Sequence, residues 1–407
     1  MPERPQLTAI ETAIVMQIPP RAPGYPSVQL PQMKICYFGT YRTDYARNTR
    51  MIAGLRSAGM EVIECQVPLW HDTPDRVRLA SGGWVNPLVW LRVLWAYARL
   101  CRMHSRVPHY DVMVVGYPGH LDVFLASLLT RRRRKPLVWD VYMSAYLIAL
   151  DRGIGKGNPL SLRLLHSMEK RALRLPELMI IDTPEYVDWY TENFGTRPDR
   201  FRLVPPAVDE AALTRHVKPR SPAEVFRVVY HGTFIPNHGV LTIMRAAQLL
   251  GNDCGITFEL IGEGPDRSTA EVFAVEHKLA HVEFAGWLEG AALADVLATA
   301  DICLGAFGGT GQSLITVHNK IYEAMALGRP VISGDSAAVR RAFRAGEEIE
   351  LVPREDPVAL AAAIHRLRAD PLLRDRIGAA GRRAVAVGHT VAATGKLFAM
   401  DLREVAG

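Results

Sequence analysis

A lysine and a glutamate three residues apart follow a glycine-rich loop in the run from Gly309 to Asp335. The sequence there predicts a loop, a helix that begins near Asn319 or Lys320 and ends at Gly328, and a buried strand over 330–333. Residues three apart lie on one face of a helix, so Lys320 and Glu323 are neighbours. A cation in the first turn opposes the helix dipole, and an anion in front of the helix explains it. These residues could therefore bind a phosphate group.

Periodicity alone leaves a second interpretation open for the same helix. Ile321, Ala324, Met325 and Leu327 occupy the opposite, core-facing side. An amphipathic helix of this kind often carries a solvated lysine and glutamate on its outer face, with no ligand.

The elements that must position this run alternate regularly in the first half of the chain. Short apolar runs predict buried strands, and periodic stretches between them predict helices near 47–58, 88–106, 120–131, 161–174 and 184–194. The predicted strands are 34–38, 61–67, 111–116, 136–140, 177–182 and 201–205. Alternating strands and helices indicate an α/β fold with a parallel sheet covered on both faces.

A polar, proline-containing stretch follows residue 205, and the alternation then begins again. Predicted strands lie at 226–232, 256–262, 281–286, 301–306, 330–334 and 349–352, with helices near 240–250, 266–278, 289–299, 320–327, 337–344 and 356–369. We expect two doubly wound Rossmann-like domains with a cleft between them. The expected boundaries are a flexible extension over 1–33, domains over 34–205 and 223–388, a linker over 206–222, and a final helix over 389–407 that crosses back to the first domain.

The run from Gly309 to Asp335 resembles the donor-site segment of glycosyltransferase family 4, whose members have the GT-B fold of two facing Rossmann-like domains. The resemblance covers about residues 34–400 and is most specific over 310–335. It implies that Glu323 holds the ribose diol of a nucleotide, and that the loop and helix N-terminus before it receive the diphosphate. The positions concerned are Ser313, Leu314, Ile315, Thr316, Asn319 and Lys320.

The chain departs from the family's donor-site pattern at three positions. Many members carry a second Glu eight residues before the first, where this chain has Ile315, although related sub-groups whose motif begins Asn-Lys also lack it. The usual Arg and Lys of the diphosphate clamp are replaced by Thr233, after Gly232, and by His238. Losing two cations should weaken the stabilisation of a leaving diphosphate unless Lys320, His238 or backbone amides compensate.

The resemblance also assigns roles to several other loops. His120, at a strand-to-helix junction, would line the reaction centre with Lys320 and Glu323, although on sequence alone an incidental histidine beside a capping Asp122 explains the junction better. Asp140, Asp151 and Arg152 could meet an acceptor hydroxyl or be solvated. The loop after the first strand would face the diphosphate, and its candidate residues are Gly39, Arg42, Arg47 and Asn48. The turn at 260–265 would contact the base through Gly262 and Gly264.

Charge is distributed unevenly along the chain. Residues 1–204 hold 27 basic and 18 acidic side chains, a net charge of +9, and the remaining 21 basic and 24 acidic ones give −3. The stretch from Arg92 to Lys135 alone has nine basic and two acidic residues, and tryptophans at 84, 90 and 95 precede or accompany its arginines. This pattern predicts either peripheral contact with an anionic membrane or a solvated basic face.

Composition indicates a globular protein, with 49% hydrophobic and 22% charged residues. Five scattered cysteines without a CxxC pair, and a start that lacks signal-peptide features, predict a cytoplasmic location, in which the protein could contact the inner face of the membrane. The sequence has no Asp-x-Asp pair, P-loop or HExxH motif, so we expect no metal and no cofactor beyond the co-substrate.

We therefore expect a metal-independent, retaining glycosyltransferase of the hexosyltransferase type. It would move a sugar from UDP or GDP to a glycan or lipid-linked acceptor, such as a polysaccharide precursor, and would bind no nucleic acid. One alternative is a catalytically silent GT-B partner protein, suggested by Ile315, Thr233 and His238. Another is a nucleotide-sugar epimerase on the same fold.

Overall fold

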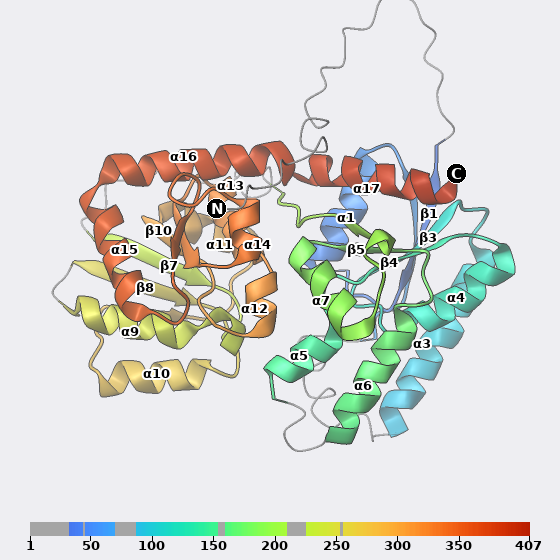
Figure 1. Ribbon diagram of the computed structural model, residues 1–407, viewed down its shortest axis with the longest axis horizontal. Helices are drawn as coiled ribbons and strands as arrows, with labels where there is room; N and C mark the ends of the chain where they lie inside the picture. Colours follow the sequence, from blue (N-terminus) through green and yellow to red (C-terminus); the bar gives the residue numbers. More distant parts are fainter. Residues whose placement is uncertain (1–31, 44, 70–86, 154–158, 210–224, 253–254) are drawn as a thin grey trace, which may run out of the picture. The chain divides into compact units, whose positions relative to one another are not determined.

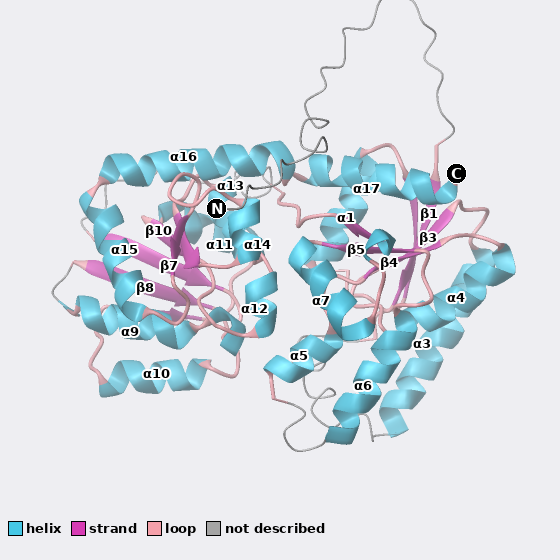
Figure 2. Cartoon of the chain, in the orientation of Figure 1, coloured by secondary structure: helices cyan, strands magenta, loops and turns pink. Residues whose placement is uncertain are grey.

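The computed structural model describes residues 32–43, 45–69, 87–153, 159–209, 225–252 and 255–407. In these ranges the chain forms two six-stranded sheets, each flanked by helices (Figure 1, Figure 2). The predicted extension up to residue 31, the predicted linker from 210 on, Trp84 and Cys254 lie outside the described residues.

The first sheet is parallel throughout, in the order β2-β1-β3-β4-β5-β6. All four positions of β3, β4 and β5 are buried, as expected for strands covered on both faces. Its strands are β1 (Lys34–Gly39), β2 (Glu61–Gln66), β3 (Val112–Val115), β4 (Leu137–Asp140), β5 (Leu178–Ile181) and β6 (Phe201–Leu203).

Alternate residues of β1 face two different hydrophobic cores, because successive side chains of a strand point to opposite faces. Ile35 and Tyr37 pack with α1 and α17, whereas Cys36 and Phe38 belong to the core that includes residues of α3 and α4. The helices of this half are α1 (Ala46–Ser57), α3 (Pro87–Arg106), α4 (Asp122–Arg133), α5 (Ala145–Asp151), α6 (Pro159–Ala172) and α7 (Pro184–Phe194), followed by the 3-10 turn η3 (Pro198–Arg200).

The second sheet is also parallel, in the order β12-β11-β10-β7-β8-β9. The order reverses direction next to β7, and in open α/β sheets binding groups gather at the carboxyl ends of strands near such a point. The strands are β7 (Phe226–His231), β8 (Ile256–Ile261), β9 (Val282–Ala285), β10 (Ile302–Leu304), β11 (Val331–Gly334) and β12 (Glu350–Val352).

Local sequence signals set the ends of several helices in the second half. Asp356 and Asp370 cap α15 and α16 with their side chains, and a proline follows each of them at the first helical position. The elements are η4 (Pro236–His238), α9 (Val240–Leu250), α10 (Arg267–Glu276), α11 (Gly290–Thr299), α12 (Gly311–Ile315), α13 (Asn319–Ala326), α14 (Ala337–Ala342), α15 (Pro357–Ala369), α16 (Pro371–Gly388) and α17 (Val391–Ala406).

Each predicted strand and each predicted helix has a counterpart within a few residues. The sequence interpretation missed α5, α12 and α16. The first two are only seven and five residues long, and α16 carries exposed leucine, valine and arginine side chains that blur its periodicity. The domain boundaries stay a prediction.

The last helix, α17, packs directly on α1 through a pair of glycines. A β-carbon on Gly395 would lie 2.1 Å from the carbonyl oxygen of Gly54, and one on Gly54 would lie 2.8 Å from the α-carbon of Gly395. Phe398 and Leu402 of α17 are fully buried in the core beside α1. The two helices therefore approach at backbone contact, and only glycine fits at both positions.

We predict that Gly395→Ala lowers the free energy of unfolding by about 2 kcal/mol or more, because the added methyl group must push α17 away from α1. Gly388→Ala is the matched control: Gly388 is also helical, nothing lies within 4 Å of its position, and the change should be neutral or slightly stabilising. Urea denaturation of both variants measures the difference. Equal stability of the two would contradict the packing described for Gly395.

Candidate functional site

Glu323 lies on α13 with both carboxylate oxygens held by basic side chains. Arg50 of α1 donates to Oε1 at 2.8 Å, and Nε2 of His231, at the end of β7, lies 3.1 Å from Oε2. Burial raises the pKa of Glu323, but the His231 hydrogen bond and the Arg50 charge outweigh it and hold the pKa at about 2. Glu323 is therefore ionised at neutral pH, and its position is fixed from two sides.

The two contacts leave acceptor capacity on Glu323. A carboxylate offers about four lone-pair positions, and Arg50 and His231 use one on each oxygen. One free position remains on each oxygen, so the group can accept hydrogen bonds from two adjacent hydroxyls.

Lys320 is buried one turn before Glu323, with 6% of its surface exposed. Its Nζ lies 4.0 Å from the centre of the Tyr230 ring and 3.2 Å from Nδ1 of His238. Among the described residues no carboxylate comes within ion-pair distance of it. Burial therefore lowers the pKa of Lys320 well below its usual value, although the Glu323 charge opposes this shift. A buried cation without an ion pair is costly, and an anionic ligand would remove that cost.

Two histidines surround the lysine. The rings of His238 and His318 pack edge to face, with centroids 5.1 Å apart. Burial lowers the pKa of both well below 6.5, and the positive charge of Lys320 adds to the shift. Both imidazoles are therefore neutral at physiological pH, and they add no charge beside Lys320. Nδ1 of His318 is buried without a hydrogen-bond partner.

The Gly232 turn lies against the lysine. A β-carbon on Gly232, whose φ is +135°, would come within 2.8 Å of Lys320 Nζ, so any other residue would displace the amine. The carbonyl of Thr233 accepts a hydrogen bond from Tyr230. These contacts place Gly232, Thr233 and His238 beside Lys320.

Gly262 and Gly264 allow two turns to pack on each other. A β-carbon on Gly262 would lie 2.0 Å from the carbonyl oxygen of Gly232, and one on Gly264 would lie 2.4 Å from that of Phe234. Close backbone packing is thus a sufficient reason for both glycines, and contact with a base stays a prediction.

Arg354, which the sequence interpretation missed, organises the loop before α12. Its Nη1 donates to the carbonyl of Gly308 at 2.8 Å and to Oγ of Ser313 at 2.7 Å, and its Nε donates to the carbonyl of Asp335. Burial lowers the pKa of this guanidinium to about 10. Its Nη2 is buried without a partner, so one donor remains beside the loop.

The segment from α12 to α13 also contacts the first half of the chain. The hydroxyl of Thr183 donates to the carbonyl of Ile315 at 2.6 Å, and Tyr142 donates to Asn319 at 3.4 Å. Asp151 accepts a hydrogen bond from the amide of Gln312 at 2.9 Å. The Ile315 side chain packs on the core of the first half, which explains an apolar residue there. Leu314 is exposed, and the Thr316 hydroxyl is buried without a partner.

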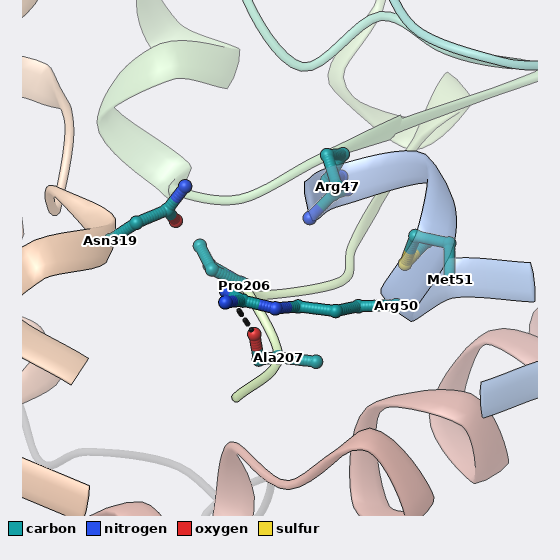
Figure 3. A pocket seen from close by; sticks show the side chains of 6 residues that line it. All are labelled: Arg47, Arg50, Met51, Pro206, Ala207 and Asn319. Carbon is teal, nitrogen blue, oxygen red and sulfur yellow. Dashed lines mark hydrogen bonds between the residues drawn. The ribbon is translucent and has the colours of Figure 1, made fainter. Parts of the chain in front are cut away.

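A small pocket lies between the two halves beside Glu323. It is lined by Arg47, Arg50 and Met51 of α1, Pro206 and Ala207 of the segment after β6, and Asn319 of α13 (Figure 3). Arg50 also donates to the carbonyl of Ala207 at 3.0 Å. The space between these side chains is about 220 Å³, a figure that includes space open to solvent.

The structure gives structural tasks to three residues with other predicted roles. Both ends of the Arg47 guanidinium bind Asp140, at 3.0 and 2.9 Å, and Asn48 donates to the carbonyl of Tyr117. Asp122 does not cap its helix. It accepts hydrogen bonds from the amide and hydroxyl of Thr40 and so fixes the turn at Gly39, where a β-carbon would meet its carboxylate at 2.8 Å. The cap interpretation of Asp122 was therefore wrong.

His120 lies in the first half, beside α6. Its Nε2 is 3.6 Å from Oε1 of Glu169, and its ring packs edge to face on Trp139. Its contacts among the described residues are with these groups rather than with Lys320 or Glu323. The reaction-centre role of His120 stays a prediction.

Asp182, at the end of β5, is a further residue that the sequence interpretation missed. It is 8% exposed, and neither carboxylate oxygen has a hydrogen-bond partner in the structure. Burial raises its pKa to about 7; the Arg47 charge opposes the rise, and Asp140 and Glu185 add to it. Its neighbour Thr183 binds Ile315, so this group lies close to where the two halves meet.

Comparison with known proteins identifies the family and the fold of this chain. Residues 225–370 match the family model described as "Glycosyl transferases group 1", and residues 42–207 match the "Glycosyl transferase 4-like domain". The chain belongs to glycosyltransferase family 4 and has the GT-B fold, as the sequence predicted.

The matches to individual relatives cover only part of each sequence or have low sequence identity. The chain is 40% identical over 106 residues to a phosphatidyl-myo-inositol mannosyltransferase of Mycobacterium leprae, a match that covers 26% of this chain and 27% of the relative. It is 31% identical over 163 residues to the lipopolysaccharide core biosynthesis glycosyltransferase LpsD of Rhizobium meliloti, covering 40% and 45%. These matches thus span less than half of either relative. HepE of Anabaena, solved with UDP, superposes with a TM-score of 0.66 at 14% identity and covers 92% of this chain and all of that one.

Among the described residues, no group of three or more His, Cys, Asp or Glu could hold a metal ion. None of the described helices is both long and apolar enough to cross a membrane. Cys36, Cys65, Cys101 and Cys303 are free thiols.

Asp182 generates a prediction about stability. Its pKa of about 7 in the folded protein exceeds the value of about 3.9 for an unfolded chain, so the folded state holds its proton more tightly. Its contribution is neutral below about pH 4 and becomes steadily more destabilising up to about pH 7, by about 1.4 kcal/mol per pH unit. Asp182→Asn should therefore gain stability relative to the parent as pH rises.

Urea denaturation of the parent and Asp182→Asn at pH 5 and pH 8 measures this difference. Asp140→Asn is the control, because that carboxylate is paired with Arg47 and its loss should destabilise the fold at both pH values. A stability difference between parent and Asp182→Asn that is the same at pH 5 and pH 8 would show that Asp182 has an ordinary pKa.

Proposed function

We propose that this protein is a glycosyltransferase that takes its sugar from a nucleoside diphosphate sugar. The observation that carries the proposal is the pair on α13: an ionised Glu323 with two free acceptor positions, next to a buried Lys320 with no ion pair. A nucleoside diphosphate offers a ribose diol to the first group and a diphosphate to the second. The UDP complex of HepE, a protein with the same fold, is consistent with such a donor.

The ribose end of the donor would bind to Glu323. Charge-assisted hydrogen bonds are each worth about 1.5–3 kcal/mol, so two from one diol would supply a large part of the nucleotide affinity. Arg50 and His231 keep the carboxylate ionised and oriented before the ligand arrives. The site therefore spends little free energy on reorganisation when the donor binds.

The diphosphate would lie in front of Lys320, at the N-terminus of α13. The N-cap residue, His318, makes no side-chain hydrogen bond to the first turn, so no capping side chain competes with a ligand for the first amides. Negative charge grows on the diphosphate as the glycosidic bond breaks, and Lys320 with these amides would stabilise it. Lys320 and the helix N-terminus would thus take over from the Arg and Lys that the family usually carries at the positions of Thr233 and His238.

We assign acceptor binding to the first half of the chain. His120 lies beside Glu169 and packs on Trp139, and Asp182 has two acceptor atoms without a hydrogen-bond partner among the described residues, near the contact between the halves. The retaining stereochemistry expected from the family needs no protein nucleophile, since the departing diphosphate can accept the proton of the acceptor hydroxyl. A lipid-linked acceptor is consistent with relatives named for lipid and lipopolysaccharide substrates.

The two alternative functions, a catalytically silent partner protein and a nucleotide-sugar epimerase, make different predictions. A silent partner protein would have no reason to keep a buried, unpaired lysine, because that group destabilises the fold unless an anion uses it. An epimerase would change the nucleotide sugar without an acceptor. Incubation with a panel of UDP- and GDP-sugars, followed by chromatography of the sugar nucleotide, distinguishes release of the free nucleoside diphosphate from isomerisation. Absence of both products with every donor would contradict the proposal.

Lys320 should act mainly on turnover. We predict that Lys320→Met lowers kcat by about 100-fold and weakens binding of the free nucleoside diphosphate much less, because the charge it meets grows in the transition state. Lys396→Met, on the exposed side of α17, is the matched control and should change neither value. Steady-state kinetics and calorimetry test both variants; an equal loss in affinity and turnover would make Lys320 a ground-state binding group only.

Activity should also be independent of divalent metal ions, because a helix N-terminus and Lys320 would neutralise the leaving group. The measurement is initial rate with excess chelator and after adding back Mg²⁺ or Mn²⁺. Complete loss in chelator that either metal restores would transfer leaving-group stabilisation to a bound cation.

A further inference from the structure

Helix α3 exposes large apolar side chains on the side that faces away from its own core. Val89, Val93, Ala96 and Leu100 are buried, at the spacing of a helix packed on a sheet. Trp90, Leu91, Leu94 and Trp95 lie between these positions and are exposed, Leu94 to 64% and Trp95 to 59%. Single exposed apolar residues are common, but four within two turns on one stripe indicate an interaction surface.

The same outer face becomes basic towards the end of the helix. Arg99, Arg102 and Arg106 are exposed there, and Arg99 stacks on Trp95 with its guanidinium carbon 5.3 Å from the ring centre. Arg133 of α4 donates to the carbonyls of His104 and Val107 and so fixes the end of α4 to the end of α3.

The end of α4 adds more positive charge. Arg131, Arg132 and Arg134 are exposed, and Arg131, Arg134 and Lys135 line a shallow pocket at this place. Residues 92–135 include nine basic and two acidic side chains. One of the two acidic residues, Asp122, is buried against Thr40, so its negative charge does not offset the positive charge of the surface. An apolar stripe and a basic cluster thus follow one another along the same pair of helices.

The apolar part lies towards the edge of the sheet that carries the candidate site. Tyr97, in the middle of α3, lies beside Asp122, which follows β3 and holds the turn after β1. Helix α3 ends at the start of β3, so its first residues lie at the opposite edge of the sheet, where the strands end (Figure 1). Residues 90–96 are therefore nearer to that edge than Tyr97 is. A surface bound to this stripe would lie near the edge of the first sheet where Asp122 holds the turn after β1.

We propose that α3 and the end of α4 form a docking surface for an anionic phospholipid bilayer. Trp90, Leu91, Leu94 and Trp95 enter the boundary between headgroups and acyl chains, and the arginines contact lipid phosphates. Aromatic and arginine side chains suit this position, because one end of each is apolar and the other polar or charged. A second copy of the chain is a poorer occupant, because two such faces would bring their arginine clusters together.

This inference concerns a binding surface and does not depend on the proposed sugar transfer. The experiment measures co-sedimentation of the full chain with vesicles of phosphatidylcholine, with and without phosphatidylglycerol, and with no sugar nucleotide present. Leu91→Glu/Leu94→Glu removes the apolar stripe. Val272→Glu/Val275→Glu is the matched control, because these α10 valines are exposed to a similar degree, and thermal unfolding checks that both variants stay folded.

We expect the parent to bind vesicles that contain phosphatidylglycerol and to bind them less as salt is raised. The α3 variant should bind at least about tenfold more weakly, and the α10 variant as the parent does. Arg102→Glu/Arg106→Glu should lose affinity for the anionic vesicles only. Equal binding of the α3 variant and the parent, or no binding by the parent, would overturn the proposal. So would a parent dimer in solution that only the α3 variant dissociates, which would make this face a self-interface.

Discussion

A buried lysine that has no ion pair within the described part of the chain is the constraint on which this site depends. Lys320 is enclosed by the Tyr230 ring, His238 and the Gly232 turn, and burial strongly disfavours its charged form. The surrounding histidines are neutral and the nearest carboxylate, Glu323, is already engaged by Arg50 and His231. An anion bound beside Lys320 would favour its charged form again, so the site is organised to bind an anion.

The same segment also joins the two halves of the chain. Arg50 of α1 donates a hydrogen bond to Glu323. Thr183 donates to the carbonyl of Ile315, and Asp151 accepts a hydrogen bond from the amide of Gln312. Glu323 and Ile315 are among the residues proposed to bind the donor, so the proposal implies that donor binding and the contact between the halves are coupled. Closure of such halves excludes water and strengthens the electrostatic interactions within the site.

Much of the fold was predictable because the pattern is local. Buried strands such as β3 and β5 are continuous apolar runs, and helices such as α7 carry a capping Thr183, a proline and a final Gly195 in sequence. Lys320 and Glu323 could be singled out for the same reason, since a helix places residues three apart side by side. The solvated interpretation of this pair failed, because the depth at which a helix is buried depends on elements far away in the sequence.

Long-range partners were not predictable. Arg50 and Glu323 are separated by 273 positions and His231 and Glu323 by 92, and nothing in the sequence marks either contact. Arg47 follows the loop expected to face the diphosphate, yet Asp140 binds both ends of its guanidinium. Asp182 looks like an ordinary residue before a capping threonine, and only the structure shows its two unpaired oxygens.

The central claim is that Glu323 holds the ribose diol, and a binding cycle tests it most directly. Calorimetry would compare a nucleoside diphosphate that the parent binds with its 2′,3′-dideoxy analogue, on the parent and on Glu323→Ala. Removing the hydroxyls should weaken binding to the parent by about tenfold or more, and should change binding to Glu323→Ala very little, because the partner of the diol is already absent. The account would be contradicted if the dideoxy analogue lost the same affinity on both proteins.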